Sequence, residues 1–81
     1  MRIEGRPLLL VEWYDATSNH SGWEKLDVIA KQTPPVVRSV GWLLRRTKRH
    51  ITLVASIVGD EGSSDVTIPA SWVISERELK T

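Results

Sequence analysis

Five residues that can bind an anion lie between positions 45 and 50 of this 81-residue chain: Arg45, Arg46, Lys48, Arg49 and His50. Arginine and lysine donate charge-assisted hydrogen bonds to phosphate oxygens, and a cluster of them binds nucleic acid or a phosphorylated small molecule in a salt-sensitive way. The same residues equally suit a solvated hairpin turn, whose charges keep a strand edge from aggregating. The sequence leaves both interpretations open.

The aromatic residues form a second candidate site. The chain has four tryptophans, one tyrosine and no phenylalanine. Trp13 and Tyr14 end the first expected strand, and Trp23 begins the only expected helix. If the intervening loop folds back, Trp23 comes close to Tyr14 and makes an apolar cleft in which a base or a peptide aromatic could stack. Packing in the core is the favoured interpretation, because tryptophan offers a large apolar area.

Catalytic chemistry has few candidates. The stretch "DATSNHS" holds Asp15, Ser18, His20 and Ser21, but a triad needs a base oriented by a buried carboxylate, and so short a loop rarely delivers that geometry. His20 and His50 are the only histidines and there is no cysteine, so no zinc-ligand spacing is present. No glycine-rich phosphate loop is found. We therefore expect no enzyme, no metal site and no cofactor.

Charge and length limit the broad class. Eleven Lys and Arg against ten Asp and Glu leave a net charge of +1, far less basic than a general nucleic-acid-binding domain. The length predicts one domain over residues 1–81. The apolar run 8–11 is too short for a signal peptide or a membrane span, and the lack of cysteine fits a reducing compartment. We expect a cytoplasmic protein that does not contact membranes.

Alternating apolar residues predict five strands, at 7–14, 36–46, 50–58, 65–69 and 73–79. Gly41 within the second strand indicates a bulge or sharp bend. Pro69 has no N–H to donate, so the chain must leave the sheet there. The segment "GDEGSSD" (59–65) has the composition of a flexible acidic loop.

One short helix is expected over residues 23–32. Ser21 and Glu24 have capping-box spacing, and Pro34 and Pro35 end the helix. One stripe of the helix is apolar, formed by Trp23, Leu26, Ile29 and Ala30. Buried against the strands, this stripe would cover one end of a barrel. The predicted fold is mainly β, a small five-stranded antiparallel barrel with one short inserted helix.

Two stretches resemble known small barrels. "IPASWV" (68–73) resembles the signature near the end of SH3 domains, where a 3₁₀ turn separates the last two strands. "SVGWLLRRTKRHITLV" (39–54) is similar to the bent hairpin of SH3-like and Sm-like barrels, with Gly41 at the bend. The overall layout is similar to small bacteriophage and prophage proteins to which no activity is assigned. The resemblance implies an SH3-like barrel of phage origin, acting in the host cytoplasm.

The departures from these families narrow the function. The chain lacks the acidic first loop and the paired tryptophans of peptide-binding SH3 domains, and "RRTKRH" stands where an Sm protein has its RNA-binding loop. We therefore expect a binding module that docks on a host or phage protein, with inhibition of a host defence or regulatory system as its role. The alternative is a barrel that binds nucleic acid or nucleotide through the basic hairpin. Because open barrels leave unpaired strand edges, a homo-oligomer, most simply a dimer, is expected.

Overall fold

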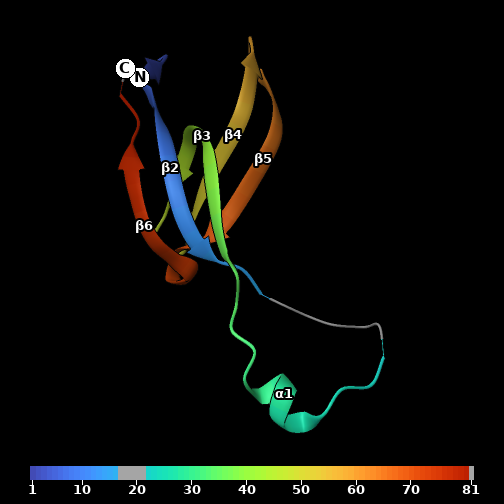
Figure 1. Cartoon of the computed structure of the whole chain (residues 1–81). Coiled ribbons are helices and arrows are strands. Elements are labelled where there is room, and N and C mark those ends of the chain that lie inside the picture. The colour runs from blue at the N-terminus through green and yellow to red at the C-terminus, as the bar shows by residue number, and fades with distance from the viewer. Residues whose placement is uncertain (17–21, 81) are drawn as a thin grey trace.

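The computed structural model describes residues 1–16 and 22–80. One antiparallel sheet forms the body of the molecule, and a short helix lies well apart from it (Figure 1). The elements in chain order are β1 (Arg2–Ile3), β2 (Arg6–Tyr14), α1 (Leu26–Ala30), β3 (Val36–Arg46), β4 (His50–Val58), β5 (Glu61–Pro69), the 3₁₀ turn η1 (Ala70–Trp72) and β6 (Val73–Glu78). The expectation of a mainly β chain with one short helix is confirmed.

The sheet is a meander to which the last strand returns. Strands β2, β3, β4 and β5 pair in sequence order, β6 pairs with the free side of β2, and β1 pairs with the start of β2. Alternate residues of the central strands point to one face and make the core, because side chains alternate along a strand. The core cluster consists of Leu9, Val11, Ile51, Leu53 and Ile68.

The sheet does not close into the expected barrel. Within residues 1–16 and 22–80, no ladder joins the two edge strands, β5 and β6, which are connected only through η1. Pro69 ends β5 and its missing N–H cannot extend a ladder, so the chain turns through η1 before β6 begins. The sheet therefore has an opening between the start of β4 and β6.

The acidic segment 59–65 is a strand and not a flexible loop, so the expected strand 65–69 was too short. Val58 pairs with Glu61, which leaves a two-residue turn of Gly59 and Asp60. Gly59 has a φ of 58°, the left-handed backbone that glycine adopts at the first position of a type II′ hairpin turn. Gly-Asp at this spacing is a hairpin signal that outweighs the polar composition.

Gly41 marks a close strand crossing. The bulge lies two residues further along, where the β3–β4 register shifts between Leu43 and Arg45. A Cβ at position 41 would lie 3.0 Å from the Cβ of Leu53 and 3.0 Å from the carbonyl oxygen of Val54. Glycine is needed here because β4 passes directly over its α-carbon.

The expected helix lid is also wrong. The helix spans only Leu26–Ala30, its N-cap residue Lys25 makes no side-chain capping bond, and none of its residues is buried. Ser21 of the expected capping box lies outside the described residues. The radius of gyration, 16.0 Å, exceeds the roughly 12 Å of a compact 81-residue domain. Residues 22–35, called the arm below, project beyond the sheet (Figure 1).

The Pro34–Pro35 pair forms the root of the arm. The carbonyl oxygen of Pro35 accepts a hydrogen bond from the backbone N–H of Asp15 at 3.0 Å, directly after the Tyr14–Val36 pair that ends the β2–β3 ladder. Proline fixes φ and keeps the residue before it extended. The arm therefore leaves the sheet on a stiff stem. No helix in the described part of the chain is long and apolar enough to cross a membrane.

Candidate functional site

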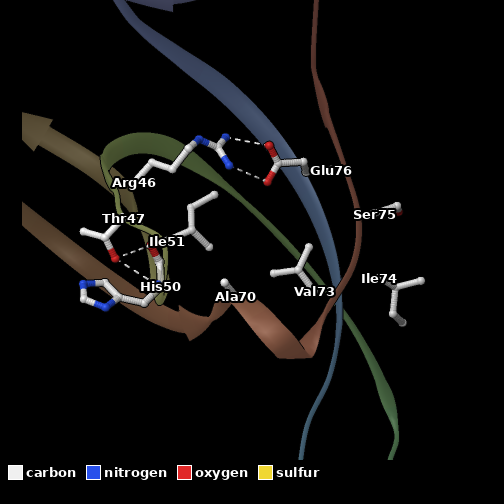
Figure 2. Close-up of a pocket in the computed structure, with 9 residues that line it drawn as sticks. All are labelled: Arg46, Thr47, His50, Ile51, Ala70, Val73, Ile74, Ser75 and Glu76. Atoms are coloured by element: carbon white, nitrogen blue, oxygen red, sulfur yellow. Dashed lines mark hydrogen bonds and ion pairs between the residues drawn. The ribbon is translucent and has the colours of Figure 1, made fainter.

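The opening in the sheet forms a pocket of about 290 Å³ between the β3–β4 turn, η1 and β6 (Figure 2). Its floor is apolar, because it includes the buried core residue Ile51 and the half-buried Val73. Polar groups line its rim. The full lining is Arg46, Thr47, His50, Ile51, Ala70, Val73, Ile74, Ser75 and Glu76.

An ion pair crosses one wall of this pocket. The two terminal nitrogens of Arg46 lie 3.0 and 2.6 Å from the two carboxylate oxygens of Glu76 on β6. Register places both side chains toward the core, since Arg46 pairs with Ile51 and Glu76 with Val11. The hydrogen bond to Glu76 raises the pKa of Arg46 above its ordinary value, so this guanidinium stays charged at every working pH.

Thr47 organises the basic turn. Its hydroxyl oxygen accepts hydrogen bonds from the backbone N–H groups of Arg49 and His50, at 3.1 and 3.0 Å, while the backbone N–H of Thr47 donates to the carbonyl oxygen of His50 at 2.9 Å. This arrangement is a local side-chain turn of the kind that Thr favours. It fixes Lys48 and Arg49 at the tip, beside the mouth of the pocket.

The basic cluster divides into two groups. Arg46 is held by Glu76, whereas Arg45, Lys48 and Arg49 are exposed and, within residues 1–16 and 22–80, lie in no ion pair. His50 is half-buried at the start of β4, opposite Pro69, and lines the pocket. Three free cations therefore remain available on the surface. Whether they contact phosphate stays a prediction.

Trp13 is part of the core rather than of an open cleft. Its ring packs against the core cluster and stacks on Trp72, with centroids 6.5 Å apart and an interplanar angle of 18°. Its indole N–H donates to the hydroxyl oxygen of Ser39 at 3.0 Å. Tyr14 points to the opposite face and is 48% exposed, in a shallow hollow shared with Pro34 and Trp72.

The alternative cleft between Tyr14 and Trp23 does not form in the described structure. Trp23 is 104% exposed, so its indole contacts nothing in the described structure, and Tyr14 shares its shallow hollow with Trp72 instead. Leu26 is 84% exposed, and Val28 and Ile29 are about half exposed. The arm therefore carries an apolar surface that has no partner within residues 1–16 and 22–80.

Sequence reasoning missed the far wall of the pocket. Ala70, Ile74 and Glu76 lie on η1 and β6, where the sequence predicts an exit from the sheet at Pro69 and a strand over 73–79 but no binding residue. Register on β2 places Glu76 beside Val11 on the core face, from which it reaches Arg46 across the opening, and register is a tertiary property. The possible hydrolytic set falls mostly outside the described residues, since of its members only Asp15 is described. Among the described residues, no three His, Asp or Glu side chains gather as a metal site.

Comparison with protein-family models, with curated proteins and with solved structures finds no match to this chain.

Proposed function

We propose that this chain is a small non-enzymatic protein-binding module whose docking element is the arm. The observation that carries the proposal is the exposure of Trp23 and Leu26, at 104% and 84%. Leaving side chains of this size in water forgoes about 1.5–3 kcal/mol each, relative to burial. A protein partner that covers them recovers this free energy.

The residue types favour a protein as the ligand. Tryptophan is among the residues that most often dominate binding energy at protein interfaces, where it fills a desolvated pocket. Trp23, Leu26 and Ile29 follow one another at helical spacing, the pattern of an amphipathic helix that lies in an apolar groove. The short α1 would lengthen and become rigid on contact with such a groove.

An SH3-like fold is part of the same proposal. The order β6-β2-β3-β4-β5, with a 3₁₀ turn before the last strand, supports an SH3-like scaffold in which the arm occupies the first long loop. On the resemblance to phage proteins, the partner is a host or phage protein. The scaffold would then serve to present the arm.

Capture with matched variants tests the proposal. The immobilised wild-type chain, Trp23→Ser and Leu26→Ser are compared with Lys25→Ser and Lys31→Ser, which alter exposed polar positions of the same arm. Recovery of a specific partner from host lysate should fall about thirtyfold in the apolar variants, the effect of losing an interface hot spot, and should persist in the lysine variants. Equal recovery by all five proteins would refute the arm as the docking element.

A second candidate function rests on the three free cations of the basic turn. Arg45, Lys48 and Arg49 are exposed together at one hairpin, enough to neutralise two or three phosphates. Wild type should then bind single-stranded DNA, RNA or nucleotides at low salt, with an affinity that falls as salt rises. Lys48→Glu with Arg49→Glu should abolish this binding, whereas Arg77→Glu on β6 should preserve it. Absence of salt-sensitive binding by wild type removes this candidate.

A further inference from the structure

We propose that the first partner of the arm is a second copy of this chain: Trp23 of each protomer enters the pocket between η1, β4 and β6 of the other. This inference rests on the proposed function, because it names the protein that covers the arm. Four observations support it: the surface area of the chain, the chemistry of the pocket, the charges around both, and the end of the sheet at which arm and pocket lie.

The exposed area matches what a dimer buries. The chain has 6360 Å² of accessible surface, whereas a compact monomer of 9.2 kDa exposes about 4,900 Å². The excess of roughly 1,450 Å² is larger than the about 800 Å² that each partner contributes to a stable interface of standard size. Because so much of its surface is exposed, this chain can bury more area by docking its arm than a compact chain of the same mass could.

The pocket suits one indole ring. Its volume of about 290 Å³ lies at the lower limit for small-molecule pockets, roughly 300 Å³, which fits a single large side chain. The floor, with Ile51 and Val73, is apolar. At the wall, Arg46 supplies a cation for an aromatic face and Glu76 an acceptor for an indole N–H (Figure 2).

Charges beside the two surfaces are complementary. Lys48 and Arg49 are exposed at the turn between Thr47 and His50, two residues that line the pocket. Glu24 and Asp27 are exposed next to Trp23 on the arm. Docking Trp23 in the pocket brings these carboxylates toward the free cations of the other protomer. Such rim charges set orientation and association rate.

The geometry favours exchange between copies over folding back. The arm leaves the sheet on the stiff Pro34–Pro35 stem, from the end of the β2–β3 ladder. The pocket opens at that same end, since Trp13 pairs with Val73 at the start of β6. In a twofold dimer each protomer uses the same two surfaces. The arm of each protomer can therefore dock in the pocket of the other, because arm and pocket lie at the same end of the sheet.

The test combines charge reversal with light scattering across micromolar concentrations. Wild type should be a dimer. Trp23→Ala removes the anchor from both arm–pocket contacts and should therefore dimerise about a thousandfold more weakly, or about thirtyfold for each lost anchor. Glu24→Lys with Asp27→Lys, and separately Lys48→Glu with Arg49→Glu, should each weaken the dimer. The protein carrying all four changes should regain it. Arg77→Glu is the matched control, because alternation along β6 places this charge on the face opposite to Glu76, and this variant should remain dimeric.

Mixing two defective proteins identifies the exchange itself. Trp23→Ala keeps an intact pocket, and Ala70→Trp fills the pocket of a chain with an intact arm. Each should be monomeric alone, and their mixture should form a dimer held by one arm. A wild-type monomer, or a dimer unaffected by Trp23→Ala, overturns the inference. If a monomeric chain still captures another protein through Trp23, the proposed function stands and only the second-copy assignment fails.

Discussion

Arg46 and Glu76 are thirty residues apart in the chain and joined by a two-point ion pair, with nitrogen–oxygen distances of 3.0 and 2.6 Å. This pair connects the β3–β4 hairpin to β6 across the opening where no ladder forms between the described edge strands. It lies above Ile51, whose side chain is 2% exposed. The ion pair thus closes one side of the pocket with side chains, at a place where no backbone hydrogen bonds join the strands.

The ion pair should contribute little to stability, because both side chains are partly exposed, at 49% and 33%. We expect Arg46→Gln to lower the free energy of unfolding by no more than about 1 kcal/mol, the range of surface pairs. Urea unfolding of Arg46→Gln, Glu76→Gln and the double variant gives the coupling between them. A coupling well above this range would show that the pair is desolvated, as docking of a partner over the pocket would make it.

The turn should depend on the hydroxyl of Thr47. Thr47→Val keeps the shape but leaves the backbone N–H groups of Arg49 and His50 without their acceptor. We expect a loss of about 1 kcal/mol and faster amide hydrogen exchange at these two positions. Thr47→Ser retains the acceptor and is the control. Unchanged exchange in Thr47→Val would show that water replaces the hydroxyl at no cost.

A methyl group at position 41 should be poorly tolerated. The Cβ of Gly41→Ala would approach the backbone oxygen of Val54 at 3.0 Å, and backbone cannot move aside as a flexible side chain can. We expect a loss of about 1–3 kcal/mol, typical of overpacking. Gly59→Asn is the comparison, because space around position 59 is open and any cost there comes from the positive φ of the backbone rather than from a clash. Thermal unfolding of both variants compares the two costs directly.

Truncation in the core should have the largest effect. Ile68 is 0% exposed and belongs to the main cluster, so Ile68→Ala should cost about 2–5 kcal/mol. In a domain this small, such a loss can approach the whole stability. Val58→Ala is the control, because Val58 is 79% exposed and should change the free energy of unfolding by less than about 0.5 kcal/mol. Similar losses of unfolding free energy in Ile68→Ala and Val58→Ala would show that Ile68 does not belong to the core.

The strands were predictable where the local sequence pattern agrees with the position of the strand in the sheet. Residues 36–46 and 50–58 were predicted with the bounds that β3 and β4 have, because their β-branched and apolar residues agree with their tertiary role. The prediction of a loop over 59–65 was wrong because polar composition says less about this segment than the Gly59–Asp60 turn. The backbone geometry of that turn continues the hairpin. The two-residue strand β1 was missed although Glu4 and Gly5, both with positive φ, form the turn that creates it.

The site was less predictable than the fold. The basic turn is local in sequence, and its position at a hairpin tip was anticipated. The pairing of Arg46 with Glu76 depends on how β6 registers on β2, which no spacing in the sequence encodes. The prediction that the helix packs against the sheet was wrong for a different reason. The stripe at Trp23, Leu26 and Ile29 was interpreted as a surface buried against the sheet, whereas periodicity identifies an apolar stripe without identifying what covers it.

The long connection between β2 and β3 also has a polymer-chain consequence. Tyr14 pairs with Val36, so this ladder closes a loop of 21 residues, 15–35. Loop-closure entropy grows as about (3/2)RT ln n, which makes this loop roughly 1.5 kcal/mol more costly to close than a connection of about four residues. Shortening it would stabilise the sheet while removing the arm. Thermodynamic stability and docking therefore favour opposite lengths for this one connection.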